Sequence, residues 1–260
     1  MPERYAGIVV ALALAWFGAL TGPASRAQEP AIPLVTGEWP PYAGEKLEGG
    51  GFAVAVVKAV FAEMGRRSQL KFYPWKRCEA YVQQGIAWAT FPYAITPERE
   101  AHYLFSDPLF EGKDVWFYYG EKMQSVDYEE LTDLRPYTIG GASGYWYSEL
   151  FREAGLTIDK TSNDVVGLRK LQAGRIDLFP MNELAGVWLI NSYFPAQRHR
   201  FGILKKPLRH LQNALMVSKN YPNSRELLQE FNGALQRVRA KGIDRQLLEK
   251  YHLRLEFSSE

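Results

Sequence analysis

Strand-like and helix-like segments alternate along this chain, and this alternation constrains the fold more than any other feature. The short apolar segment 31–36 is predicted as a strand. Residues 52–64 then carry apolar side chains at helical spacing, with Gly65 where a C-terminal cap belongs. A strand at 70–73 and a helix at 76–84 follow. Alternation of this kind is typical of a parallel sheet in an α/β domain.

The second half of the chain repeats the pattern. The expected elements are strands at 114–119, 137–140, 175–180 and 212–217, helices opening at Tyr145 and spanning 163–172 and 182–190, and a mostly helical segment at 224–251 with a break near Gly242. The sequence therefore predicts two α/β units of similar build, between which the chain crosses at about residues 118 and 212.

Residues 1–27 are typical of a secretory signal peptide. After a short positive start, residues 8–20 form an uncharged apolar run that is shorter than the about 20 residues of a membrane-spanning helix. Small residues, Ser25 and Ala27, precede a cleavage site at Gln28. A retained N-terminal anchor is the alternative. We expect an exported, periplasmic protein that is cleaved near Ala27.

Composition argues against several classes of function. Cys78 is the single cysteine, so an exported form cannot close an internal disulfide and depends on an ordinary apolar core. The net charge is +2 with the two signs interspersed, which argues against nucleic-acid binding. The four histidines are scattered without metal-ligand spacing, and there is no nucleophile-elbow motif. We therefore expect neither a metal nor a cofactor.

Several short motifs occur in a characteristic order. A strand and a proline-aromatic loop lead to Gly-Phe and a helix, and Thr-Pro-Glu-Arg at 96–99 precedes Phe-Ser-Asp-Pro-Leu at 105–109. Gly-Arg-Ile-Asp at 174–177 and a terminal segment at 241–251 (KGIDRQLLEKY) follow. In this order the motifs resemble the family 3 extracellular solute-binding proteins, the periplasmic receptors of polar amino-acid ABC transporters. The resemblance covers essentially the whole mature chain.

This resemblance implies a type II periplasmic-binding-protein fold, in which two α/β lobes are joined by a two-strand hinge. The first lobe would comprise residues 28–117 and, on the return, 212–260, and the second lobe 118–211. Such proteins close on a small-molecule solute in the cleft between the lobes, where α/β sheets and domain boundaries favour ligand sites. The implied partner is an ABC-transporter permease in the inner membrane, with no nucleic acid, and the receptor is expected to be a monomer.

Arg99 is the principal candidate ligand contact. It falls where amino-acid-binding members of the family carry the arginine that clamps the ligand carboxylate, a role that suits the planar guanidinium group. The alternatives are a cap of its own loop or an ion pair with Glu98, Glu100 or Asp107.

The resemblance assigns further contacts. Trp39 and Trp75 match aromatic walls that could sandwich a ligand, with core packing as the alternative. The other candidates are Tyr42, Tyr93, Thr96, Ser143, Gly144, Tyr145, Asn182 and Glu183. The Gly-rich segment 141–146 offers backbone amides to an anion at a helix N-terminus, or it is simply a tight turn that needs glycine.

The expected pocket departs from the family pattern at two places. Asn182 stands where the family has an acid for the ligand ammonium, and an amide cannot supply that charge. Glu183 and Glu38 are the nearest acids. Residues 91–94 replace the usual hydroxyls before the arginine loop. The solute is therefore predicted to be a small carboxylate, and the choice between an amino acid and an organic acid stays open.

Two other functions compete with a transport receptor. One is a periplasmic enzyme on the same fold, of the cyclohexadienyl dehydratase type, with Glu183 or Glu38 as general acid. The other is a sensory accessory binding protein without a transporter. Because the sequence offers no catalytic group beyond lone carboxylates, we favour a receptor that catalyses nothing. Cys78, beside Lys76 and Arg77, is interpreted as a packed helix residue.

Overall fold

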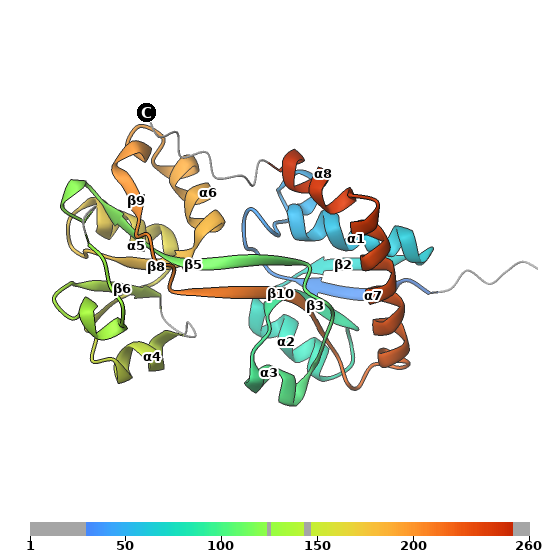
Figure 1. Cartoon of the computed structure of the whole chain (residues 1–260). Coiled ribbons are helices and arrows are strands. Elements are labelled where there is room, and N and C mark those ends of the chain that lie inside the picture. The colour runs from blue at the N-terminus through green and yellow to red at the C-terminus, as the bar shows by residue number, and fades with distance from the viewer. Residues whose placement is uncertain (1–29, 124–125, 143–146, 252–260) are drawn as a thin grey trace, which may run out of the picture. The chain divides into compact units, whose positions relative to one another are not determined.

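The structure is a computed structural model that describes residues 30–123, 126–142 and 147–251 (Figure 1). The chain divides into residues 1–30 and a compact unit, Ala31–Glu260. The predicted signal peptide lies outside the described residues. Within the described ranges, no helix combines the length and the apolar character needed to cross a membrane.

The described elements follow one another in the order strand, helix, strand along most of the chain. The strands are β1 (Ile32–Thr36), β2 (Ser68–Phe72), β3 (Ala89–Ala94), β4 (Leu104–Phe105), β5 (Phe110–Tyr119), β6 (Ile139–Ala142), β7 (Ile158–Thr161), β8 (Phe179–Asn182), β9 (Phe201–Ile203) and β10 (Arg209–Val217). The helices are α1 (Phe52–Met64), α2 (Trp75–Gln83), α3 (Pro97–His102), α4 (Tyr147–Glu153), α5 (Asp164–Gln172), α6 (Glu183–Tyr193), α7 (Ser224–Ala240) and α8 (Ile243–Lys250), with short 3-10 turns η1 (Glu48–Gly50), η2 (Glu121–Met123), η3 (Leu131–Leu134) and η4 (Arg198–Arg200).

The main sheet has the order β2-β1-β3-β10-β5-β8. Strands β1, β2 and β3 are parallel, with Leu34 of β1 opposite Leu70 of β2. Strand β10 is antiparallel to both β3 and β5. The predicted parallel pairing therefore holds for the first three strands and for a separate two-stranded sheet of β6 and β7. The later strands of the main sheet are antiparallel: β5 and β10, which lie side by side in Figure 1, run in opposite directions between the two halves of the chain.

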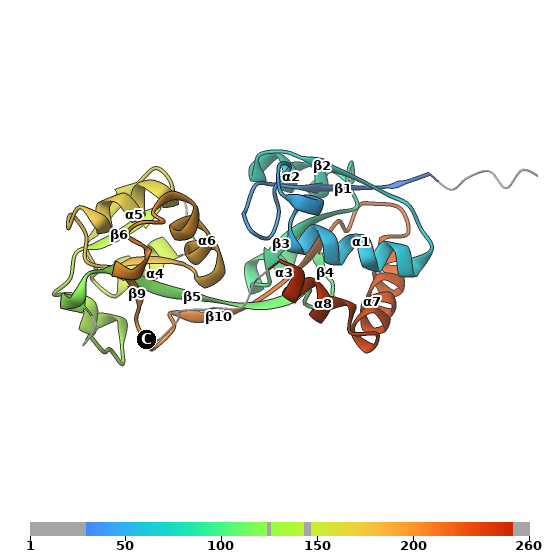
Figure 2. The ribbon, with the colours of Figure 1, turned by 90° about the horizontal axis from the view of Figure 1, so that it is seen from above.

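Strands β1 and β3 are covered on both faces, whereas the edge strand β2 is exposed on one of its faces. Leu34 of β1 is buried under α1, whereas the next residue, Val35, packs with Cys78 and Val82 of α2 on the other face. Helix α1 also contacts α7, as Figure 2 shows. The two-residue alternation of a strand thus sends neighbouring side chains into two different apolar clusters.

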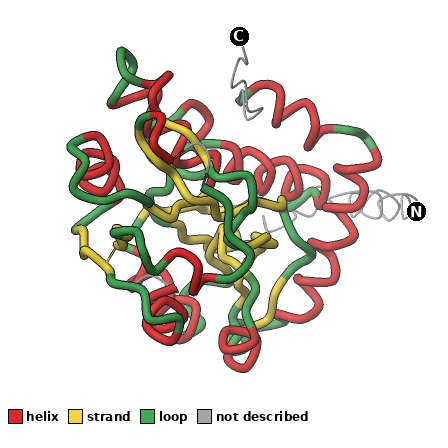
Figure 3. Tube along the Cα trace, turned by 60° about the vertical axis from the view of Figure 1, so that its left-hand side comes forward, coloured by secondary structure: helices red, strands yellow, loops and turns green. Residues whose placement is uncertain are grey.

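The second half has its own core around β5. Val115 and Phe117 pack with α5 and α6, whereas Trp116 packs with Phe151 of α4 on the opposite face. Figure 3 shows the strands running between helices in both halves. Each half is therefore an α/β lobe with apolar clusters of its own, although Ala185 of α6 packs with the cluster of the first half. Strands β5 and β10 form the two-strand hinge of the type II fold. The predicted crossing points, 118 and 212, fall within these two strands.

The structure corrects the expected bounds of several strands. Strand β5 begins at Phe110 and not at 114, and β6 spans Ile139–Ala142 and not 137–140. Strand β8 begins at Phe179, whereas the sequence pattern placed it at 175–180. Arg175 N donates to Lys170 O, and Gly174 adopts a φ of 65°, so these residues still close α5. Strands β3, β4, β7 and β9 and the six-residue helix α3 were not among the expected elements, because such short segments lack a clear period.

Glu63 joins α1 to α7. Its carboxylate accepts hydrogen bonds from Lys241 Nζ at 2.6 Å and from Arg237 Nε at 2.9 Å. These two bonds hold the pKa of the Glu63 carboxyl below its usual range. A depressed folded-state pKa stabilises the fold above the unfolded pKa, about 4.3, and this contribution is lost as the pH falls through the folded value.

We therefore expect Glu63→Gln to lower the free energy of unfolding at pH 7 and to have progressively less effect as the pH falls below about 4. Urea denaturation of both proteins at pH 7 and at pH 3 measures this difference. A deficit in the variant that is equally large at both pH values would contradict the assignment.

Candidate ligand-binding site

The main candidate contacts lie in the three segments that directly follow the parallel strands. Trp39 follows β1, Trp75 follows β2, and Arg99 follows β3. The carboxyl ends of neighbouring parallel strands meet at one edge of a sheet, which is where open α/β sheets bind ligands. The sheet topology therefore brings these three residues to the same edge of the first lobe.

Trp75, Tyr93 and Arg99 form a continuous aromatic and basic surface at that edge. The Trp75 and Tyr93 rings meet edge-on with their centroids 5.3 Å apart, and Tyr93 Oη donates to Trp75 O at 3.5 Å. Arg99 Cζ lies 4.9 Å from the centroid of the Tyr93 ring. Gly37 packs under the indole, since a Cβ there would lie 2.5 Å from Trp75 Cε2. The loop after β1 thus needs glycine for Trp75 to lie against it.

Thr96 starts the helix that carries Arg99. Its side chain accepts from Arg99 N at 3.4 Å, and Pro97 occupies the first turn, as a helix N-terminus favours. The Arg99 guanidinium donates from Nη1 to Ala94 O at 2.9 Å. Helix capping and one carbonyl bond therefore fix the base of the arginine while most of its donors stay uncommitted.

The predicted alternative partners of Arg99 lie elsewhere. Within the described residues, no carboxylate lies within ion-pair distance of its guanidinium, Glu98 and Glu100 included. Asp107 accepts instead from Gln236 Nε2 at 2.7 Å. A half-buried guanidinium on an aromatic ring, without an acid beside it, is suited to an anionic ligand.

Tyr42 and Asn182 are joined to each other. Tyr42 is fully buried, stacks on Phe110 with centroids 4.6 Å apart, and donates from its hydroxyl to Asn182 Oδ1 at 2.8 Å. Burial raises the pKa of Tyr42 well above its usual range. Asn182 Oδ1 also accepts from Ala185 N at 3.2 Å as the N-cap of α6, and Nδ2 donates to Lys113 O at 3.3 Å. Both ends of the Asn182 amide are thus engaged by protein groups.

Two ion pairs occupy consecutive positions of β5. Lys113 Nζ lies 3.5 Å from Glu183 Oε2, and Arg209 Nε lies 3.0 Å from Asp114 Oδ2. Burial, opposed by Asp114 and assisted by the nearby charge of Arg99, lowers the pKa of Arg209. These pairs are not apparent from the sequence. The register of β5 with β10 brings Asp114 to Arg209, and the register of β5 with β8 brings Lys113 to Glu183.

The remaining candidates have separate surroundings. Trp39 is half-buried and its ring lies 4.6 Å from that of Tyr42, while Glu38 accepts from Glu45 N at 2.9 Å and closes the turn after β1. Ser143, Gly144 and Tyr145 lie outside the described residues. Cys78 is buried in α2, as interpreted from the sequence, and burial raises the pKa of its thiol.

Metal chemistry finds no support in the described part of the chain. No group of three or more histidine, cysteine, aspartate or glutamate side chains there could hold a metal ion.

The lobes, the hinge and the edge site define the class of two-lobed solute-binding proteins. The sequence matches the bacterial extracellular solute-binding proteins, family 3, over residues 34–254, and the chain belongs to this family. No relative is found among curated protein sequences.

Solved structures share the fold at low sequence identity. A histidine kinase sensor domain with similarity to periplasmic binding proteins is 19% identical with a TM-score of 0.71, covering 87% of this chain and 97% of its own. The substrate-binding protein of an amino acid ABC transporter is 20% identical, with a TM-score of 0.66 and coverages of 86% and 100%. The ancestral amino acid-binding protein AncCDT-1, a precursor of cyclohexadienyl dehydratase, is 18% identical, with a TM-score of 0.65 and coverages of 85% and 94%.

Proposed function

We propose that this protein is a periplasmic receptor that captures a small carboxylate-bearing solute between its lobes by hinge closure and delivers it to an ABC-transporter permease. Membership of an extracellular solute-binding family and the fold shared with an amino acid ABC-transporter receptor support the proposal. A cleaved signal peptide and a monomeric state belong to it as well.

Arg99 is the observation that carries this proposal. It lies at the carboxyl edge of the parallel strands, rests on the Tyr93 ring 4.9 Å away, and has no acidic partner among the described residues. Two parallel N–H donors of its guanidinium match the two oxygens of a carboxylate. Trp75 and Trp39 would supply the aromatic walls, and Thr96, Tyr93 and Tyr42 would support the loops that carry them.

The charges around the site favour an acid without an ammonium group. Asn182 is neutral and its amide is engaged on both sides, while the carboxylate of Glu183 already faces Lys113 at 3.5 Å. An ammonium would therefore have to displace Lys113 or rely on the indole faces. We expect organic or aromatic carboxylates to bind more tightly than the α-amino acids of matching size.

Thermal melting of the mature protein against amino acids, dicarboxylates, aromatic acids and polyamines tests the proposal. A solute at 100 times its dissociation constant adds about 2.7 kcal/mol to the free energy of unfolding, which is a measurable shift. A shift with a class of carboxylates supports the receptor and identifies its solute. Stabilisation by polyamines alone would contradict a carboxylate site.

An enzyme on this fold is the second candidate, because one structural neighbour is the precursor of a dehydratase. Prephenate therefore belongs in the panel, with its conversion followed by absorbance. A rise in melting temperature without conversion of prephenate supports a receptor. Conversion of prephenate would instead indicate an elimination enzyme, and Glu183 would be the first residue to test as its general acid.

A further inference from the structure

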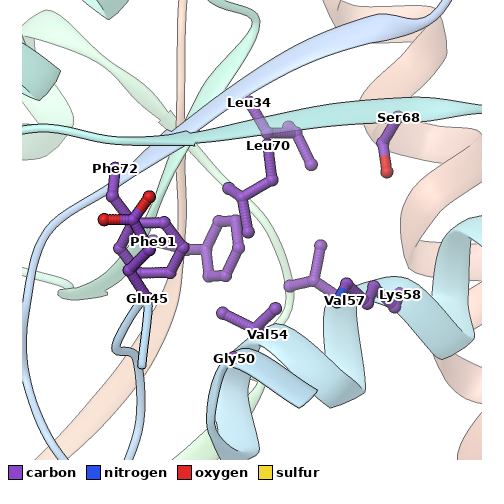
Figure 4. A pocket seen from close by; sticks show the side chains of 10 residues that line it. All are labelled: Leu34, Glu45, Gly50, Val54, Val57, Lys58, Ser68, Leu70, Phe72 and Phe91. Carbon is purple, nitrogen blue, oxygen red and sulfur yellow. The ribbon is translucent and has the colours of Figure 1, made fainter. Parts of the chain in front are cut away.

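A cavity lies in the first lobe, between α1 and the strands β1 and β2, with a volume of about 350 Å³. Figure 4 shows the side chains that line it. Apolar residues form most of the wall and three polar side chains join them: Leu34, Val54, Val57, Leu70, Phe72 and Phe91, with Glu45, Lys58 and Ser68. This volume and this mixture are typical of sites for small molecules.

The cavity forms because β2 is the edge strand of the sheet. Helix α1 covers β1, where Leu34 is 2% exposed, and it also packs against α7 and α8. The residues of β2 that face the same side, Leu70 and Phe72, are half-buried. The cover that α1 gives to β1 thus stops short of β2.

The polar side chains lie at the two ends of this cavity. Because the chain reverses direction between α1 and β2, Lys58 of the helix lies at the same end as Ser68, the first residue of the strand (Figure 4). Glu45 and Phe72 lie at the other end. Lys58 Nζ donates to Gly49 O at 3.1 Å and has two further N–H groups, and the Ser68 hydroxyl makes no hydrogen bond within the described residues.

We propose that this cavity binds a small molecule with an apolar body and an anionic head group, the head held by Lys58 and Ser68. Lys58 and Ser68 both line the cavity, and an ammonium and a hydroxyl can each donate to an anion. The site is distinct from the carboxylate site of Arg99: its head-group end lies at the amino end of β2, whereas Trp75 and Arg99 follow the carboxyl ends of the strands.

Isothermal titration calorimetry with octanoate tests the proposal, with octylamine as a probe of equal body and opposite head charge. The titrations use the Arg99→Ala variant, so that the carboxylate site cannot contribute. We expect octanoate to bind this variant and octylamine to bind at least tenfold more weakly. Adding Lys58→Met should weaken octanoate about tenfold, as the loss of one charge-assisted bond implies. Lys71→Met is the matched control, because Lys71 lies at an exposed position of β2 and does not line the cavity. This change should leave the affinity for octanoate unaltered.

Leu70→Trp provides a second variant, because a half-buried position accepts a larger side chain that fills the cavity and should abolish octanoate binding. The proposal is overturned if octanoate fails to bind the Arg99→Ala variant, if octylamine binds as tightly, or if Lys58→Met has no more effect than Lys71→Met. Because these readouts do not depend on Arg99, the result also stands apart from the proposed receptor function.

Discussion

Replacing Arg99 with alanine is expected to weaken binding of the carboxylate solute at least 100-fold. The guanidinium would contribute two charge-assisted hydrogen bonds, each of about 1.5–3 kcal/mol, and a loss of about 2.7 kcal/mol already corresponds to 100-fold in affinity. The fold should remain, because the variant loses a single bond to Ala94 and the ring contact with Tyr93. Calorimetric titration of the solute identified by melting, together with the melting temperature of the free variant, measures both effects.

Two further variants make the result specific. Arg99→Lys keeps the charge and loses the planar fork, so we expect an intermediate affinity. Arg77→Ala is the matched control. Arg77 lies in α2 and its Cζ is 5.2 Å from the centroid of the Tyr73 ring, so this variant also loses a contact between a guanidinium and a tyrosine, and its affinity for the solute should not change. Unchanged affinity in Arg99→Ala, or an equal loss in Arg77→Ala, would remove the carboxylate clamp from the site.

Local signals explain why much of the fold could be predicted. The helix at 52–64 has the bounds that its apolar spacing and Gly65 indicate, because Gly65 adopts the left-handed conformation, with a φ of 67°, that ends α1. Thr96 and Pro97 are signals of the same kind for the start of α3, although this helix was not among the expected elements. Helix caps and the spacing of apolar residues depend on residues that are close in the sequence. They can therefore be recognised from a single sequence.

The details of the site depend on contacts between distant segments. The motif indicated a loop at Arg99, whereas the residue lies in the short helix α3. That Asp107 does not pair with Arg99 follows from its bond to Gln236 of α7, a residue far away in the sequence. Similarly, nothing near Asp114 in the sequence indicates Arg209. Strand register decides such pairs, and register is a property of the folded sheet.

Two partners of Asn182 also come from distant segments of the chain and could not be predicted from the sequence. From the motif alone, Asn182 stands at the position expected for a ligand-binding acid, without the charge of an acid. The structure gives the side chain three protein partners: the Tyr42 hydroxyl, Ala185 N and Lys113 O. The amide oxygen accepts from two of these partners and the amide nitrogen donates to Lys113 O, and an ionised carboxylate could not make this last bond.

Asn182→Ala is accordingly expected to lower the free energy of unfolding by about 2–4 kcal/mol. Loss of the α6 cap accounts for about 1 kcal/mol, and leaving the fully buried Tyr42 hydroxyl without a partner adds about 1–3 kcal/mol. Urea denaturation at pH 7 measures the change. For comparison, Asn163→Ala removes the N-cap of α5, where Oδ1 accepts from Val166 N at 3.0 Å, and should cost about 1 kcal/mol alone.

Adding Tyr42→Phe to Asn182→Ala separates the two contributions. In the wild type, Tyr42→Phe removes a hydrogen-bond donor and should destabilise the fold by about 1 kcal/mol. In the Asn182→Ala background the same change removes an unpaired buried hydroxyl, so it should raise the free energy of unfolding instead. This reversal of sign follows directly if the hydroxyl depends on Asn182. A double variant that is less stable than Asn182→Ala would mean that the hydroxyl has another partner, and Asn182 would then act on stability through the helix cap alone.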